Sequence, residues 1–117
     1  MQFATSNRSS TASLFSSSSN VHDFIESETG SHKVVVFSKS YCPYCRQTKK
    51  LFKEMKERDM VVHELDQMPT GTSIQRELFQ LTGQTTVPNV WVNGQHVGGN
   101  DDTQAAAHSG KLQQMIQ

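Results

Sequence analysis

Short runs of apolar and β-branched residues alternate along the chain with segments whose apolar residues recur every three to four positions. The run KVVVFS at residues 33–38 is continuous, as in a strand covered on both faces, and VVHEL at residues 61–65 indicates a second strand. The segment between them, residues 43–58, has apolar side chains on one face and lysines on the other, which predicts an amphipathic helix. This order predicts a parallel pair of strands joined by a right-handed crossover.

A further helix and a hairpin follow the second strand. Thr72 and Gln75 have the spacing of a capping box, and the apolar periodicity after them predicts a helix that ends at Gly83. The segments VWV and QHV then flank Asn93 and Gly94, a pair typical of a tight hairpin turn. We therefore expect two antiparallel strands to complete the sheet.

Helices are also predicted at both ends of this unit. The first would follow a cap at Ser19 or Asn20 and end at Gly30, and the last would follow a cap at Asp101 or Asp102. The resulting order is α-β-α-β-α-β-β-α. It predicts an α/β fold with a four-stranded mixed β-sheet flanked by helices on both faces.

The first twenty residues differ in composition from the rest. Serine dominates residues 1–20, and Arg8 is their only charged side chain. Such a segment buries too little apolar surface to offset its ordering entropy, so we expect a disordered Ser-rich tail and one domain over residues 21–117. The absence of acidic residues before Asp23 is mildly typical of an organelle transit peptide. We favour a plain tail and a cytoplasmic protein, with organelle targeting as the alternative.

Charge and composition exclude several classes of protein. The formal net charge is zero, with eleven basic and eleven acidic side chains, whereas a nucleic-acid-binding domain normally carries a basic excess. The longest apolar run, VVVF, is far too short to span a membrane. Two cysteines do not make a disulfide-rich secreted scaffold. We therefore expect neither nucleic acid nor membrane as a partner.

Both cysteines, Cys42 and Cys45, lie in the segment SYCPYCRQTKK. Cys42 follows the first predicted strand and starts the next helix, where free amide hydrogens and the helix dipole favour a thiolate. A free thiol is only a few per cent ionised at neutral pH, so nearby cations should help. These cations are Lys39, Arg46, Lys49 and Lys50. We expect Cys42 to be the nucleophile and the more buried Cys45 to attack a mixed disulfide formed on it.

A cysteine pair at this spacing can also form a structural disulfide or bind a metal. A structural disulfide closing so short a loop would restrain the unfolded chain little. A zinc site needs four ligands, and the five histidines do not fall at ligand spacings, so we expect no bound metal. An iron–sulfur cluster shared by two chains is compatible with the spacing. The position of the pair in the predicted fold favours thiol–disulfide chemistry.

Two further segments bear on a ligand. Pro88, in the segment TVP, is either an ordinary strand entry or a cis proline that leaves the backbone of Val87 free to pair with an extended ligand. The segment GGNDDT, residues 98–103, is either a tight turn with a helix cap or an anion site, whose Asp101 and Asp102 would receive an ammonium group. Together with the thiol, these segments suit a ligand that has carboxylates, an amine and a thiol. Glutathione has all three.

The segments VVVFSKSYCPYC, TVPNVWVNGQHVGG and NDDT closely resemble those of the dithiol glutaredoxins. The similarity covers about residues 21–115, and CPYC combined with TVP and GG-x-D is far more specific than a CxxC pair. The resemblance implies a thioredoxin fold and a glutathione-dependent thiol–disulfide oxidoreductase that uses glutathione as co-substrate and has no tightly bound cofactor. Its substrates would be glutathionylated proteins and protein disulfides, with ribonucleotide reductase among those that the family often serves. We expect a monomer.

The resemblance also implies roles for individual residues. Cys42 would carry glutathione as a mixed disulfide, Cys45 would serve the dithiol route, and Tyr44 would flank the sulfur. The glycine carboxylate of glutathione would be held by Lys39 and Gln75, its cysteine backbone by Val87 at an edge shaped by Thr86 and cis Pro88, and its γ-glutamyl end by Gly99, Asp101 and Asp102. Many relatives have a cysteine where this chain has Asn100, so regulation through that thiol is not expected.

Two rival functions remain at this point. One is a dimer that holds an iron–sulfur cluster on two Cys42 thiolates and two glutathiones. The monothiol branch that carries such clusters has glycine after the first cysteine and serine in place of the second, whereas this chain has Pro43 and Cys45. The other is a thioredoxin-like reductase that does not use glutathione. The Pro-Tyr pair between the cysteines argues against this second rival, and Lys39 and Asp101 suit the binding of glutathione, a charged tripeptide.

Overall fold

The computed structural model describes residues 17–117. Its elements, in chain order, are α2 (Ser17–Ser31), β1 (Val34–Ser38), α3 (Pro43–Glu54), β2 (Met60–Glu64), the 3-10 turn η1 (Leu65–Gln67), α4 (Gly71–Thr82), β3 (Asn89–Val92), β4 (Gln95–Gly98), α5 (Asn100–Ser109) and α6 (Lys111–Ile116). The tail expected over residues 1–20 lies mostly outside the described residues and stays a prediction. Within the described part, no helix is both long and apolar enough to cross a bilayer.

The four strands form one mixed sheet in the order β2-β1-β3-β4. β1 pairs in parallel with β2, with Val34 opposite Met60, and antiparallel with β3, where Val34 lies opposite Val92. β3 and β4 form the predicted hairpin, whose turn residues Asn93 and Gly94 both have positive φ, 47° and 79°. The fold expected from the sequence, a mixed four-stranded sheet of the thioredoxin type, is confirmed.

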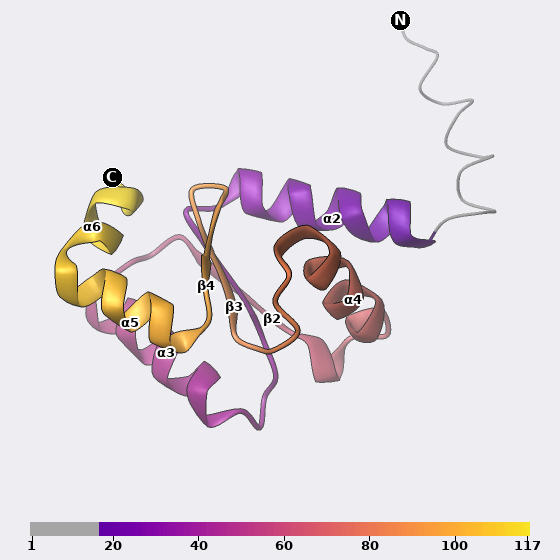
Figure 1. Ribbon diagram of the computed structural model, residues 1–117, viewed down its shortest axis with the longest axis horizontal. Helices are drawn as coiled ribbons and strands as arrows, with labels where there is room; N and C mark the ends of the chain where they lie inside the picture. The colour runs from indigo at the N-terminus through magenta and orange to yellow at the C-terminus, as the bar shows by residue number, and fades with distance from the viewer. Residues whose placement is uncertain (1–16) are drawn as a thin grey trace, which may run out of the picture.

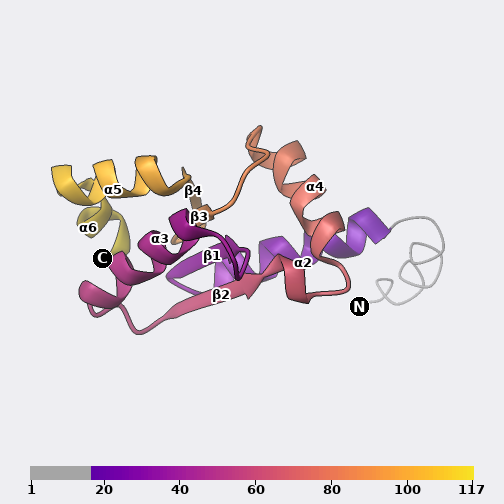
Figure 2. The same cartoon turned by 90° about the horizontal axis from the view of Figure 1, so that it is seen from below.

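Helices cover both faces of the sheet (Figures 1 and 2). Successive side chains of β1 enter opposite faces, and a separate apolar core lies on each face. Val35 and Phe37 pack with α2, η1 and α4, whereas Val34 and Val36 pack with α3, β3 and α6. All four side chains are fully buried. The continuous apolar run in the sequence therefore reflects a central strand covered on both sides.

Several helix boundaries differ from those expected. α4 begins at Gly71 and not after Thr72, because a Cβ at position 71 would lie 1.8 Å from the carbonyl oxygen of Leu65, so only glycine allows this close approach. The predicted capping box is therefore wrong. The amide of Gln75 donates to the carbonyl of Thr85, at 2.9 Å.

The other differences are smaller. α3 ends at Glu54, four residues early, and the chain then turns through Lys56, whose φ is 60°. α5 is capped by Gly99, and Asp102 lies in its first turn, where its carboxylate accepts from the Gly99 N–H at 3.4 Å. α2 begins at Ser17, before the expected caps.

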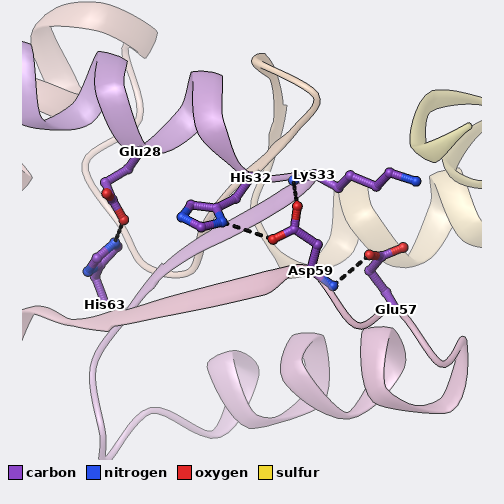
Figure 3. Close-up of polar contacts among 6 residues, drawn as sticks. All are labelled: Glu28, His32, Lys33, Glu57, Asp59 and His63. Carbon is purple, nitrogen blue, oxygen red and sulfur yellow. Dashed lines mark hydrogen bonds and ion pairs between the residues drawn. The ribbon is translucent and has the colours of Figure 1, made fainter.

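Polar contacts fasten α2 to β2, and the residues after α2 to Asp59, which directly precedes β2 (Figure 3). Glu28 accepts from Nε2 of His63 at 2.8 Å, and the imidazole of His63 lies beside the rings of Phe24 and Phe37, with centroids 5.1 and 5.4 Å away. These contacts fix α2 over the face of the sheet opposite α3.

Candidate functional site

Cys42 is the N-cap residue of α3, as the sequence predicted. Its N–H donates to the carbonyl of Lys39 at 3.0 Å, and Pro43 occupies the first helical position, where no amide hydrogen is needed. The sulfur of Cys42 accepts the N–H of Cys45 at 3.1 Å. A side chain that caps a helix in this way faces free amides and the positive end of the dipole, and an anionic sulfur is stabilised by both.

The two thiols differ in environment. Cys42 is 9% exposed, whereas Cys45 is fully buried under it. Burial, with a further contribution from the hydrogen bond to Cys42, raises the pKa of Cys45 to about 11. Cys45 is therefore a protonated thiol at neutral pH, and Cys42 is the sulfur that a substrate can reach.

The loop before β3 lies against the thiol. The Val87–Pro88 peptide bond is cis, and the pairing of Val87 with an extended ligand stays a prediction. The carbonyl oxygen of Val87 is 3.9 Å from the Cys42 sulfur, within reach of a weak S–H donor. The backbone of Val87 thus runs beside the sulfur of Cys42.

A groove of about 460 Å³ opens next to this loop. It is lined by Tyr44, Gln84, Thr86, Val87, Pro88, Gly99, Asn100, Asp101 and Asp102. Every residue predicted to contact glutathione lines it except Lys39 and Gln75. Tyr44 is 59% exposed and forms an open wall of the groove.

The two remaining residues lie outside the groove. Gln75 lines a separate hollow of about 310 Å³ with Arg76 and Phe79, and its amide is engaged by Thr85. Lys39 is partly exposed. Hydrogen bonds from Ser40 lower the pKa of the nearby Asp66, and the positive charge of Lys39 makes a smaller contribution in the same direction. The structure thus does not bring either residue to the groove wall.

Of the four cations expected to favour the Cys42 thiolate, Lys49 is engaged elsewhere. The ammonium of Lys49 pairs with Glu64 on β2 at 2.8 Å, and both side chains are mostly buried. Lys49 is therefore committed to fastening α3 to the sheet and is not directed at the sulfur. Arg46 is exposed on α3 one residue after Cys45.

Two groove residues were not singled out from the sequence as functional. Gln84 precedes Thr86 by two residues, and a glutamine in a loop carries no signal of its own. Asn100 was noted only as the replacement of a cysteine. It is buried, accepts from the Thr48 hydroxyl at 2.8 Å and donates to the Gln47 amide oxygen at 3.0 Å, so it joins α5 to α3.

Among residues 17–117, no group of three or more histidine, cysteine, aspartate or glutamate side chains is arranged to hold a metal ion.

Known proteins share both the sequence and the fold. The Glutaredoxin family model matches residues 34–97. Glutaredoxin-C4 of Arabidopsis thaliana is 48% identical over 94 residues, which are 80% of this chain and 69% of that protein. Glutaredoxin-C8 of Oryza sativa subsp. japonica is 49% identical over 94 residues, with the same shares of both chains.

Among solved structures, that of a buckwheat glutaredoxin–glutathione complex matches with a TM-score of 0.81 and 41% identity, covering 85% of this chain and 89% of that one. The structure of wheat glutaredoxin matches with a TM-score of 0.78 and 47% identity, covering 82% and 90%. The family match extends over both cysteines and over the loop that lies beside them. The chain therefore belongs to the glutaredoxin family of glutathione-dependent thiol–disulfide oxidoreductases and is a dithiol member, with Cys42 and Cys45 as its thiol pair.

Proposed function

We propose that the chain reduces glutathione mixed disulfides in a ping-pong cycle on Cys42. The observation that carries the proposal is the position of this sulfur. It caps α3, accepts the amide of Cys45 at 3.1 Å and lies 3.9 Å from the carbonyl oxygen of Val87, which lines the groove together with Asp101 and Asp102. A thiol at the N-terminus of a helix thus lies beside the loop that lines a groove with polar groups for a charged tripeptide.

The first half-reaction transfers glutathione to the enzyme. The Cys42 thiolate attacks the glutathione sulfur of the mixed disulfide. The bond between that sulfur and the substrate cysteine breaks, and the substrate leaves as a thiolate that takes up a proton. In the second half-reaction, another glutathione thiolate attacks the same glutathione sulfur, which releases oxidised glutathione and restores the Cys42 thiolate.

The groove supports glutathione as the co-substrate, and the buckwheat relative was solved as a complex with glutathione. We infer that the Val87 backbone pairs with the cysteine part of glutathione, beside Thr86 and Pro88. The γ-glutamyl end would lie at the start of α5, where the Gly99 backbone, Asp101 and Asp102 meet its carboxylate and ammonium groups. Lys39 and Gln75 lie outside the groove and are proposed for the glycine carboxylate on the family resemblance alone.

Cys45 adds a second route for protein disulfides. Cys42 attacks such a disulfide, and Cys45 then attacks the Cys42 sulfur, which frees the reduced protein and leaves an intramolecular disulfide that two glutathiones reduce. Because burial raises the pKa of Cys45 to about 11, its proton must leave before it attacks. The dithiol route should therefore be the slower one at neutral pH.

The physiological setting is proposed on the same basis. Glutathionylated proteins and protein disulfides would be the substrates, with ribonucleotide reductase as one candidate. We propose a monomeric protein of the cytoplasm, and organelle targeting by residues 1–20 as the alternative. The reduction potential should be close to that of other glutaredoxins, about −200 to −230 mV.

The proposal is tested by turnover of a glutathionylated peptide with glutathione, coupled to NADPH through glutathione reductase. Wild type and Cys45→Ser should both turn over, and Cys42→Ser should be inactive. A folded Cys45→Ser variant without activity would contradict the monothiol cycle, and residual activity of Cys42→Ser would contradict the choice of nucleophile. Turnover supported by a thioredoxin reductase without glutathione would favour the thioredoxin-like rival.

A further inference from the structure

The loop at residues 84–88 is held by glutamine side chains through its carbonyl groups. Gln75 donates to the carbonyl of Thr85 at 2.9 Å, and Gln84 donates to those of Thr86 and Pro88 at 2.8 and 2.7 Å. The Val87 carbonyl, by contrast, faces the Cys42 sulfur. The loop therefore directs the carbonyl of Val87 toward the sulfur, while those of Thr85, Thr86 and Pro88 accept hydrogen bonds from glutamine side chains.

Gln84 makes the larger share of these contacts. Its one amide nitrogen bridges the carbonyls on either side of Val87, so both ends of the Val87–Pro88 unit are tied to the same group. The same nitrogen would lie 3.8 Å from a Cβ built on Gly99, the N-cap of α5. Gln84 thus stands where the loop and the start of α5 meet, and it lines the groove itself.

The amide of Gln84 has a defined orientation. Because its nitrogen donates to two carbonyls, its oxygen must face His96 on β4, whose Nε2 is 3.2 Å away. That nitrogen of His96 therefore carries a proton and donates it to Gln84. The ring of His96 lies against Trp91, with centroids 5.3 Å apart. Burial lowers the pKa of His96, which favours the neutral ring in this position.

We propose that Gln84, oriented by His96, is a positioning residue that holds the Val87–Pro88 edge in register with the Cys42 sulfur for binding of the glutathionyl group. The inference rests on the proposed function and adds a residue to it. Gln84 acts through the backbone of its neighbours. Its loss should therefore weaken productive binding of a glutathionylated substrate and leave the reactivity of Cys42 itself almost unchanged.

We call the two hydrogen bonds from Gln84 to the carbonyls of Thr86 and Pro88 the clamp. The clamp predicts which of two substitutions of Gln84 impairs binding more. Gln84→Ala removes both hydrogen bonds to the loop. Gln84→Glu keeps the size of the side chain but directs a carboxylate oxygen at two carbonyl oxygens, which repel it. If Gln84 only filled space, the isosteric glutamate would be the milder change. If it clamps the loop, glutamate should be the more severe one.

The test measures kcat and KM for a glutathionylated peptide in wild type, Gln84→Ala, Gln84→Glu and His96→Phe. Gln80→Ala is the matched control, since Gln80 is an exposed glutamine of α4 that makes no side-chain hydrogen bond within residues 17–117. Gln84→Ala should raise KM about tenfold, as expected for two lost neutral hydrogen bonds, with kcat changed less than threefold. Gln84→Glu should raise KM further, and His96→Phe less. The rate of Cys42 alkylation by iodoacetamide should stay within about twofold of wild type.

A second measurement tests these two hydrogen bonds without turnover. The NMR order parameters of the Thr85, Thr86 and Val87 amides should fall in Gln84→Ala, because the loop backbone becomes more mobile, and should not change in Gln80→Ala. Unchanged order parameters, a glutamate variant milder than alanine, or a loss confined to kcat would overturn the inference. If wild type fails to turn over, the proposed function fails, and the NMR measurement still tests the role of Gln84 in holding the loop.

Discussion

Replacing Asn100 by alanine tests how the groove is built. Asn100 is 7% exposed and links α5 to α3 through Thr48 and Gln47. The hydroxyl of Thr48 is fully buried and would lose its acceptor, which costs about 1–3 kcal/mol, and the loss of the bond to Gln47 adds about 0.5–1.5 kcal/mol. We expect the free energy of unfolding to fall by about 1.5–4.5 kcal/mol in total.

The assay is urea unfolding followed by circular dichroism at fixed pH. Thr48→Val is the matched control, because the oxygen of Asn100 keeps a second donor, the amide of Gln104 at 3.1 Å, when the hydroxyl is removed. We expect Thr48→Val to cost less than Asn100→Ala, and the double variant to cost less than the sum of the two single variants. A change below about 0.5 kcal/mol for Asn100→Ala, or strict additivity, would refute the reasoning.

Three further predictions follow from individual residues. Burial raises the pKa of Cys45 to about 11, so iodoacetamide at pH 8 should modify one cysteine of the folded protein, and a doubly alkylated folded species would contradict this. Gly71→Ala should destabilise by more than about 2 kcal/mol because its Cβ would meet a carbonyl oxygen, whereas Gly30→Ala, with no atom within 4 Å, should be neutral or stabilising by thermal melting. Glu77 raises the pKa of His22 above its usual 6.5, so the stabilisation by His22 is complete below that pH and is lost as pH rises through the higher pKa of the folded state. The free energy of unfolding of His22→Gln should therefore approach that of wild type as pH rises. A difference between the two that grows with pH would contradict this prediction.

Much of the fold could be predicted because it depends on local patterns. The run of residues 34–37 indicated a strand buried on both faces, and its side chains do divide between the two cores. Asn93 and Gly94 form the predicted turn, and Gly83 ends α4 in the left-handed conformation. Each of these signals lies within a few neighbouring residues.

The signals that failed depend on contacts between distant segments. Thr72 looked like a helix cap, but α4 starts earlier because Gly71 can approach the carbonyl of Leu65 closely. Gln84 was not predicted as a functional residue, because its role depends on His96, twelve residues away, and on how the loop turns at Pro88. The cysteine pair could be found from the sequence, whereas the groups that shape the groove required the structure.

The central claim is that Cys42 alone carries glutathione as a mixed disulfide. Its most direct test is intact-protein mass spectrometry of the Cys45→Ser variant after incubation with oxidised glutathione. We predict one glutathione per chain, attached to Cys42 and removed by excess reduced glutathione. A folded variant that takes up no glutathione, or that does not release it to reduced glutathione, would contradict the claim.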